Sequence, residues 1–567
     1  MKIQFYFFLF LFSGISFSQI SRFEKEWGTY LGSAHALNKI SSIEKDADEN
    51  IFVVISISHL TSDILKFSPS GDLLWVETFG NEFEIGSLDR FGIDDIKIDA
   101  NNDLLICGWT NLTGLGTPGV FQEQIGGQMD RFLAKMNSET GDIIWFTYFG
   151  GAAHDDDSEG DSFFDYNSMI AFTPDNNIIW TTNIRSENMA TPGVFQENMD
   201  DATYVISNFT SSGQRNWTTY YGYDYSTISG LAVDETGIYV AGRTGYNFSG
   251  VHNDTYFDPS GNWQLMPGKS DMYLSKFDHT ANRVWSRYYG GPDLDLVLMN
   301  SLSLKGNQLF LCGNTFSNTG IATPNGHIIE KPEFARSGFL ASFDLAGNTL
   351  WGTYLGDFSP SNTFNSSFSH ADSPYIFVIG STAQPGLATS NAFQENILGG
   401  NDMFVMLFEI SGELIYSTYF GGEGEEVGFF HLVILENGFC LAGHTQSASH
   451  ISTPDAYIED YSGHLHGDLF IAKFVQTSLS VTDASISQNS FVIYPNPATD
   501  VIHIQLNHAN STAKIKGRIF NAAGQWIQNF SFTGTEHQIP TSSLPTGQYF
   551  VTLEIDGKIF SKTFLVK

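Results

Sequence analysis

Cysteine is scarce in this sequence, with only three in 567 residues. Cys107, Cys312 and Cys440 stand far apart, each within a hydrophobic stretch. Such isolated cysteines are typical of small core residues, whereas disulfide frameworks and metal sites need closely spaced sets. The scarcity argues against a small disulfide-stabilised scaffold, so we expect packing to hold the fold.

Basic residues are also few. The chain has 27 Lys and Arg against 62 Asp and Glu, a net charge of −35. A negative field of this size repels nucleic acid and anionic membranes. We therefore expect no nucleic-acid partner, and a soluble secreted surface or one that binds cations.

Long hydrophobic runs are missing, apart from Phe5–Phe12 near the N-terminus. Lys2 precedes this run, and the small residues Ser16 and Ser18 follow it, which predicts a cleaved signal peptide over residues 1–18. The run is too short to cross a bilayer, so we expect no transmembrane segment in the mature chain. The predicted location is secreted or at the outer-membrane cell surface.

Aromatic stretches of one kind recur seven times along the chain. They read WGTYLG, WVETFG, WFTYFGG, WTTYYG, WSRYYGG, WGTYLG and YSTYFGG, and they begin at Trp27, Trp75, Trp145, Trp217, Trp285, Trp351 and Tyr416. Successive copies start 48, 70, 72, 68, 66 and 65 residues apart. Such a period indicates a repeat architecture. Aromatics at consecutive positions predict a strand that is buried on both faces.

Each repeat also carries three further strand signals and no helical periodicity of useful length. Two strands flank a turn rich in Asp, Asn and Gly, as in DDIKIDANNDLLICGWT, and a third reads DRFLAKM or a variant of it. Four antiparallel strands per repeat predict the blade of a β-propeller. The last such strand, at 468–474, is the one that the first repeat lacks. We expect it to pair with the strand at Trp27 and close a ring of seven blades.

A Thr-Pro motif recurs between the second and third strands of most repeats. Examples are GTPGVFQE at 116–123 and ATPGVFQE at 190–197. Thr followed by Pro fits an N-cap and a first helical residue, which predicts a single helical turn with an aromatic residue beneath it. The first repeat lacks the motif, which accounts for its shorter spacing. We expect these connections to share one rim of the ring.

These motifs resemble the bacterial SBBP repeats, a family of seven-bladed β-propellers, over residues 22–475. The resemblance implies the fold alone, because the family has no common activity. The polar, Ser-rich stretch 476–490 then predicts a linker.

The C-terminal segment 491–567 contains short alternating strands between Asn, Gly and Pro turns, which predicts a small β-sandwich. It resembles the type A C-terminal sorting domain of the type IX secretion system of Bacteroidetes. The residues that carry the resemblance are Tyr494, Pro495, Asn496, Pro497, Leu544, Pro545, Gly547, Tyr549, Gly557, Lys562 and Lys567. The resemblance implies the type IX secretion machinery as a partner, followed by release from the cell or attachment to its surface.

The acidic stretch 154–165 contains the strongest candidate metal ligands. Asp155, Asp157 and Glu159 alternate as in the start of a calcium loop, although the twelfth position holds Tyr166 and not a bidentate Glu. A bound Ca²⁺ and a solvated acidic loop both fit this pattern, and we expect no other cofactor. The similar runs at 46–50 and 99–103 are typical of hairpin turns.

No nucleophile elbow, His-Glu-x-x-His helix or phosphate-binding loop is present. The sequence therefore predicts a monomeric, non-catalytic binding module for an extracellular protein or glycan. Two alternatives stay open: a secreted polysaccharide-degrading enzyme with carboxylates in the central funnel, and a structural adhesion protein.

Overall fold

The computed structural model divides into two compact units, residues 1–478 and 479–567, which we treat separately. The signal peptide predicted at 1–18 lies outside the described residues. The structure describes residues 22–33, 38–57, 60–80, 89–155, 168–199, 204–222, 226–243, 255–257, 263–265, 271–297, 299–332, 335–356, 368–370, 375–428, 430–477, 491–506, 515–522, 526–555 and 558–567.

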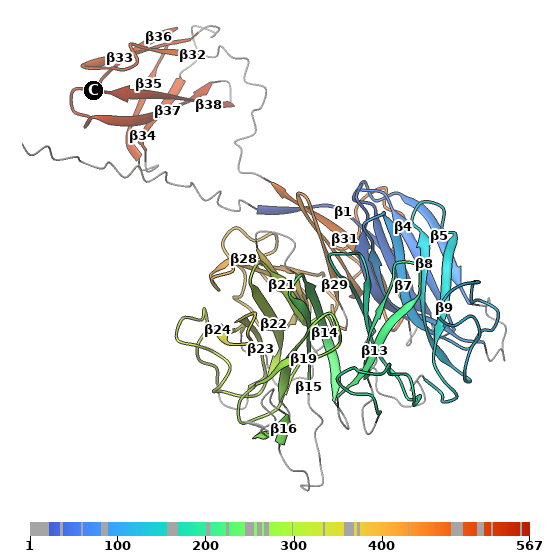
Figure 1. Ribbon diagram of the computed structural model, residues 1–567. Helices are drawn as coiled ribbons and strands as arrows, with labels where there is room; N and C mark the ends of the chain where they lie inside the picture. Colours follow the sequence, from blue (N-terminus) through green and yellow to red (C-terminus); the bar gives the residue numbers. More distant parts are fainter. Residues whose placement is uncertain are drawn as a thin grey trace, which may run out of the picture. The chain divides into compact units, whose positions relative to one another are not determined.

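The first unit contains seven antiparallel sheets of four or five strands within the described residues, here called blades 1–7 (Figure 1). Blade 1 consists of β2 (Lys39–Lys45), β3 (Ile51–Ile57), β4 (Thr61–Phe67) and β5 (Leu73–Phe79). Blade 2 consists of β6 (Phe91–Ile98), β7 (Asp103–Thr110), β8 (Asp130–Asn137) and β9 (Ile143–Phe149). Blade 3 consists of β10 (Met169–Phe172), β11 (Ile178–Asn183), β12 (Tyr204–Phe209) and β13 (Arg215–Tyr221).

The next blades follow the same plan. Blade 4 consists of β14 (Thr227–Asp234), β15 (Gly237–Arg243), β18 (Met272–Phe277) and β19 (Arg283–Tyr289), with a separate hairpin of β16 (Thr255–Phe257) and β17 (Trp263–Leu265). In blade 5, β20 (Asp295–Leu296) and β21 (Leu302–Lys305) both pair with β22 (Gln308–Thr315), which continues to β23 (Ser337–Asp344) and β24 (Thr349–Tyr354). Blade 6 consists of β25 (Phe368–His370), β26 (Ile376–Thr382), β27 (Asp402–Phe408) and β28 (Leu414–Phe420). Blade 7 consists of β29 (His431–Leu435), β30 (Gly438–Thr445), β31 (Asp468–Thr477) and β1 (Arg22–Ser33).

The blades form a closed ring, as the repeats predict. The first strands of successive blades contact one another in the order β2, β6, β10, β14, β21, β25 and β29, and β29 contacts β2 again. β1 pairs antiparallel with β31, with Trp27 opposite Lys473, so the N-terminal strand completes the last blade. The fold is a seven-bladed β-propeller. β31 extends to Thr477, so the first two residues of the predicted linker belong to a strand.

The recurrent tryptophan joins neighbouring blades. Its indole Nε1 donates a hydrogen bond of 2.9–3.1 Å to a carbonyl oxygen in the turn between the third and fourth strands of the next blade. The pairs are Trp27–Pro69, Trp145–Ser211, Trp217–His279, Trp285–Leu345 and Trp351–Ile410. Trp75 occupies the same strand position in blade 1, but its buried Nε1 has no partner in the described part of the chain. The repeat motif is thus an inter-blade contact.

The aromatic strand is buried on both faces where the next blade covers it. In β9, the side chains of Trp145, Phe146, Tyr148 and Phe149 are all at most 7% exposed. The glycine that follows this strand allows two segments of the chain to approach closely. A Cβ atom at Gly150 would lie 2.5 Å from Cγ of Asp130, so glycine is required for close approach.

The Thr-Pro connection forms a hydrogen-bonded turn, so the predicted helical turn is wrong. The connection follows the outer strand of its own blade: Thr117 N donates to Phe146 O and Tyr148 N donates to Gln122 O, both at 3.0 Å. These bonds satisfy backbone groups that would otherwise leave an open sheet edge, which a helix could not do. Phe121 contacts Phe209 of the next blade, with ring centroids 5.9 Å apart.

The second unit contains two sheets that share one core. One sheet has the order β32 (Phe491–Tyr494), β33 (Val501–Leu506) and β36 (Glu536–Pro540). The other has the order β35 (Trp526–Phe532), β34 (Ile515–Asn521), β37 (Gly547–Ile555) and β38 (Lys558–Val566). Ile502 and Ile504 of the first sheet pack with Ile519 and Val551 of the second. The predicted β-sandwich is confirmed. No helix in the described residues of either unit is long and apolar enough to cross a membrane.

Candidate functional site

Asp155, the first of the predicted calcium ligands, is fully buried in the connection from blade 2 to blade 3. Its Oδ1 accepts hydrogen bonds from the backbone N–H groups of Arg185 (2.8 Å) and Ser186 (2.7 Å). Its Oδ2 accepts from Ser186 Oγ at 2.6 Å and from Gly151 N at 3.2 Å. Asp157 and Glu159 lie outside the described residues, so the calcium site stays a prediction. Four protein donors already account for the burial of Asp155.

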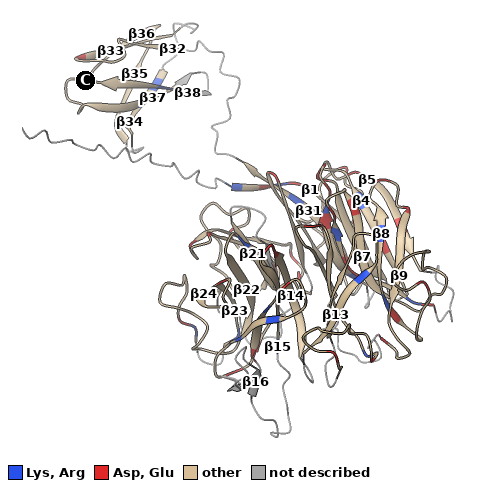
Figure 2. Cartoon of the chain, viewed as in Figure 1, with Lys and Arg blue, Asp and Glu red and all other residues tan. Residues whose placement is uncertain are grey.

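The same anchor recurs at two other blade junctions. Asp295 accepts hydrogen bonds from Gly291 N and from the hydroxyls of Thr315 and Ser317 in blade 5. Glu426 does the same with Gly422 N and with the hydroxyls of Thr445 and Ser447 in blade 7. Burial raises the pKa of Glu426 to about 7. At these three junctions, a carboxylate near the entry to a blade accepts hydrogen bonds from side chains of that blade. Acidic residues are spread widely over the propeller (Figure 2).

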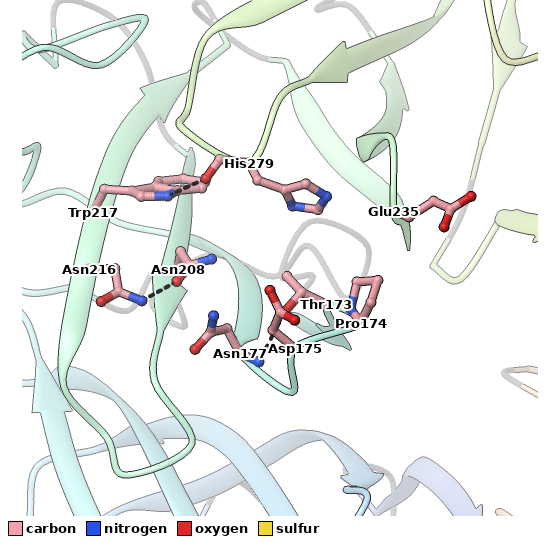
Figure 3. A pocket seen from close by; sticks show the side chains of 9 residues that line it. All are labelled: Thr173, Pro174, Asp175, Asn177, Asn208, Asn216, Trp217, Glu235 and His279. Atoms are coloured by element: carbon pink, nitrogen blue, oxygen red, sulfur yellow. Dashed lines mark hydrogen bonds between the residues drawn. The ribbon is translucent and has the colours of Figure 1, made fainter.

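A pocket of about 490 Å³ opens at the opposite, turn-bearing end of the blades, between blades 3 and 4 (Figure 3). Blade 3 contributes its first turn, together with residues of β12 and β13. Blade 4 contributes its two turns. The lining residues are Thr173, Pro174, Asp175, Asn177, Asn208, Asn216, Trp217, Glu235 and His279.

The pocket lies at a strand position that holds a lysine in four blades, whereas blades 3, 5 and 6 have Asn208, Ser342 and Leu407 there. Lys135 in blade 2 stands opposite Trp145 in the sheet register, and Asn208 stands opposite Trp217 at the same position in blade 3. Lys66, Lys276 and Lys473 occupy this position in blades 1, 4 and 7. The Asn side chain reaches two bonds less far than Lys, and in blade 3 an open volume lies beside the tryptophan.

In blade 2 the lysine forms an ion-pair network with the first turn. Lys135 Nζ lies 2.7 Å from Asp99 Oδ2 and 3.0 Å from Asp103 Oδ2. Burial alone would raise the pKa of Asp99, but hydrogen bonds, led by the one from Lys135, lower it below its ordinary value. Blade 3 has Thr173 and Asn177 at these two turn positions, since both turns are closed by the same backbone hydrogen bonds. The charged network is therefore replaced by uncharged side chains.

Trp217 and His279 form one wall of the pocket. Trp217 Nε1 donates to His279 O at 2.9 Å, and His279 Nε2 donates to Asp234 O at 2.9 Å, which fixes both rings. Nε2 carries the proton in this bond, so Nδ1 of the neutral ring is an acceptor. Within the described residues, Nδ1 has no partner. Trp217 is more exposed than its counterparts Trp145 and Trp285 because the pocket lies against it.

The sorting-signal residues lie in the second unit, where several have structural contacts. Asn496 Oδ1 accepts from Leu565 N at 2.9 Å, and its Nδ2 donates to Thr563 O at 3.2 Å, which ties the Tyr-Pro-Asn-Pro segment (494–497) to β38. Tyr549 donates to Pro545 O at 2.8 Å. The remaining positions are Leu544 beside the core, Gly547 at the start of β37, Lys562 over the Phe491 ring, Lys567 bonded to Ala498, and Gly557, which lies outside the described residues. Their role in sorting stays a prediction.

The pocket residues were not predicted from the sequence. One signal was available: the third strand of blade 3 reads YVISNF, where blades 2, 4 and 7 read RFLAKM, MYLSKF and LFIAKF. The missing lysine does not mark the site by itself, because blades 5 and 6 read GFLASF and MFVMLF and lack it too; only the structure shows where the space stays open. In the described residues, no group of three or more His, Cys, Asp or Glu is arranged to hold a metal.

Residues 492–567 match the family described as the secretion system C-terminal sorting domain. This match confirms the resemblance found for the C-terminal segment. It indicates export by the type IX secretion system to the cell surface or the extracellular space. No curated protein matches the chain.

Several solved structures are similar at low identity. A Synechocystis apocarotenoid oxygenase mutant is 11% identical, with 68% of this chain and 72% of that chain covered and a TM-score of 0.34. A polysaccharide lyase, an ulvan lyase, is 8% identical, with 73% and 92% covered and a TM-score of 0.37. PorZ, a surface component of the type IX secretion system of Porphyromonas gingivalis, is 12% identical, with 93% and 81% covered and a TM-score of 0.17. At these scores, no activity or ligand transfers to this chain.

Proposed function

We propose that this chain is a non-catalytic binding protein that acts outside the cell, and that its propeller holds an extracellular glycan or protein. The sorting domain at 492–567 supports the export route. The finer features of the proposal are an N-terminal signal peptide, an SBBP-type repeat, a Bacteroidetes source and a monomeric state. A Ca²⁺ ion bound by Asp155, Asp157 and Glu159 is part of the same proposal.

The observation that carries the binding role is the pocket between blades 3 and 4. Blades 1, 2, 4 and 7 have a lysine at the position of Asn208 in its floor, and blades 5 and 6 have Ser342 and Leu407 there. In blade 3 the space beside Trp217 stays open as a pocket. Small-molecule sites have volumes of roughly 300–1,000 Å³ and a few polar groups that converge on the ligand. The pocket, at about 490 Å³ and lined by Asn, His and Trp side chains, fits this description.

A hydrolytic role is the second candidate, because two carboxylates line the same pocket. Asp175 and Glu235 come from facing turns of blades 3 and 4, and both side chains are exposed. Glycoside hydrolases use a pair of carboxylates about 5–10 Å apart on either side of the scissile bond. This pair lies between the hairpin turns of two blades, whereas the enzyme alternative in the sequence analysis placed the carboxylates in the central funnel.

The test uses the full chain on arrays of extracellular polysaccharides and peptides, with binding and product formation followed in parallel. Binding without release of reducing sugar, unsaturated sugar or peptide fragments supports the proposal. Turnover that Asp175→Asn or Glu235→Gln abolishes would establish the enzyme instead. Loss of cell attachment on deletion of the gene, without any ligand on the arrays, would favour the structural adhesion role.

A further inference from the structure

We infer that the pocket between blades 3 and 4 binds an uncharged saccharide unit of a larger glycan. This inference rests on the proposed function, since it names the ligand class of that same site. It follows from four properties of the lining: its depth, its unused hydrogen-bonding groups, its charge and the fixed indole ring of Trp217.

The pocket has a buried floor and an exposed rim. Asn208 and Thr173 at the floor are 4% and 8% exposed. The rim residues Pro174, Asp175 and Glu235 are exposed. A ligand can therefore enter from the turn end of the ring and place one unit on the floor, while the rest of a longer chain stays outside. This is the geometry expected for one sugar of a polymer.

The floor offers both donors and acceptors that the protein leaves unused. Asn208 Oδ1 accepts from Asn216 Nδ2 at 2.6 Å, which turns its own Nδ2 toward the pocket (Figure 3). Within the described residues, the Asn208 amide nitrogen donates no hydrogen bond, and the side-chain amide of Asn177 makes none. A carboxamide donates and accepts at adjacent atoms. Vicinal hydroxyls of a sugar do the same, so the two patterns match.

The charge of the lining selects against acidic glycans. None of the nine lining residues is Lys or Arg, and Asp175 and Glu235 carry negative charge at the rim. These two carboxylates repel an acidic sugar bound in the pocket, and the −35 net charge of the chain adds to the repulsion. Sulfated and uronic-acid sugars, which proteins bind through Arg and Lys, are therefore disfavoured.

The indole of Trp217 supplies the remaining feature. Its Nε1 is held by His279 O, so the ring is fixed where it lines the pocket. A fixed aromatic ring offers an apolar surface at low cost in conformational entropy. The C–H face of a pyranose is the matching surface of a sugar, whereas a hydrated ion or an extended peptide backbone has no such face.

The test measures binding of the full chain by calorimetry to two sets of oligosaccharides. The first set is neutral: β-1,4-glucan, β-1,3-glucan, β-1,4-mannan and chitin hexamers. The second set is acidic: oligouronates and sulfated oligosaccharides. The closing variant is Asn208→Lys with Thr173→Asp and Asn177→Asp, which rebuilds the network of blade 2 and neutralises the new lysine. A second test variant is Trp217→Phe, which changes the ring that lines the pocket. Its matched control is Trp145→Phe, which changes the equivalent tryptophan of blade 2.

We expect at least one neutral hexamer to bind, the closing variant and Trp217→Phe to weaken it about tenfold or more, and Trp145→Phe to leave it unchanged. Intact far-UV and near-UV circular dichroism shows that the variants are folded. Binding that survives the closing variant overturns the site but keeps the proposed function. Binding of acidic sugars or array peptides alone, sensitive to the closing variant, overturns the ligand class. Absence of any ligand overturns both.

Discussion

Blades 2 and 3 are neighbours with the same strand order, and they differ at three positions beside the first turn. Blade 2 has Lys135, Asp99 and Asp103 there. Blade 3 has Asn208, Thr173 and Asn177 there. The tryptophan opposite the third strand bonds to the next blade in both. The comparison shows that the inter-blade contact and the filling of the space beside it are separate features, so a blade can open a pocket without losing its junction.

The largest expected difference concerns the two tryptophans. Trp145→Ala removes a side chain that is 7% exposed and hydrogen bonded to Ser211, and it should cost about 4 kcal/mol of unfolding free energy. Trp217→Ala should cost about 2 kcal/mol, because the pocket already exposes part of the ring. Chemical denaturation of both variants measures the difference. Equal costs would contradict the assignment of Trp217 to an open pocket.

The next comparison removes the floor residue of each blade. Lys135→Met leaves Asp99 and Asp103 close together without their cation, and we expect a loss of about 3 kcal/mol. Asn208→Ala loses one hydrogen bond, from Asn216, in a hydrated pocket, and it should cost about 1 kcal/mol or less. The same denaturation series measures both. If Asn208→Ala costs as much as Lys135→Met, then Asn208 has a structural role that the pocket hypothesis does not include.

The two blades should also differ in their response to acidic pH. The pKa of Asp99 is lowered in the folded protein, so its ion pair contributes stability above the ordinary aspartate value of 3.8. That contribution is lost as the pH falls through the lower folded value. The protection factors of amides in the first turn of blade 2, which correct for the slower intrinsic exchange in acid, should therefore fall below about pH 4. The first turn of blade 3, closed by Thr173 and Asn177, serves as the internal control and should not share this fall in protection.

The architecture could be predicted from the sequence, because each repeat carries the residue patterns of its own strands and turns. Tryptophan, the hairpin turns and the DxFLAKF strand recur at one period, and ring closure by β1 and β31 follows from the strand that the first repeat lacks. The pocket could not be predicted in this way. It lies where Asn208, Thr173 and Asn177 depart from the residues of blade 2, but blades 5 and 6 also lack the lysine. A departure in sequence does not show whether other side chains fill the space.

The calcium hypothesis shows a second limit of sequence reasoning, in which residues close in the sequence find their partners far along the chain. Asp155, Asp157 and Glu159 look like a local set because they alternate in the sequence. The donors that bind Asp155 include Ser186, which belongs to the next blade and lies 31 residues away. A repeat protein places such partners across a blade junction. A local motif alone therefore gives no account of where an acidic side chain finds its donors.

The smallest expected effect concerns the turn of the next blade that packs against Trp145 or Trp217. Gly213 (φ +78°) lies against Trp145, and Ala281 (φ +67°) occupies the corresponding turn position beside Trp217. Gly213→Ala adds a Cβ atom 2.9 Å from the Trp145 ring in a left-handed conformation, and should cost about 1–2 kcal/mol. Ala281→Gly relieves backbone strain but raises the entropy of the unfolded chain, so its net effect should stay within about 0.5 kcal/mol. Thermal unfolding of the two variants measures both. A large loss from Ala281→Gly would show that the methyl group of Ala281 supports Trp217 in the wall of the pocket, and the two blades would then differ in their junctions as well as in their filling.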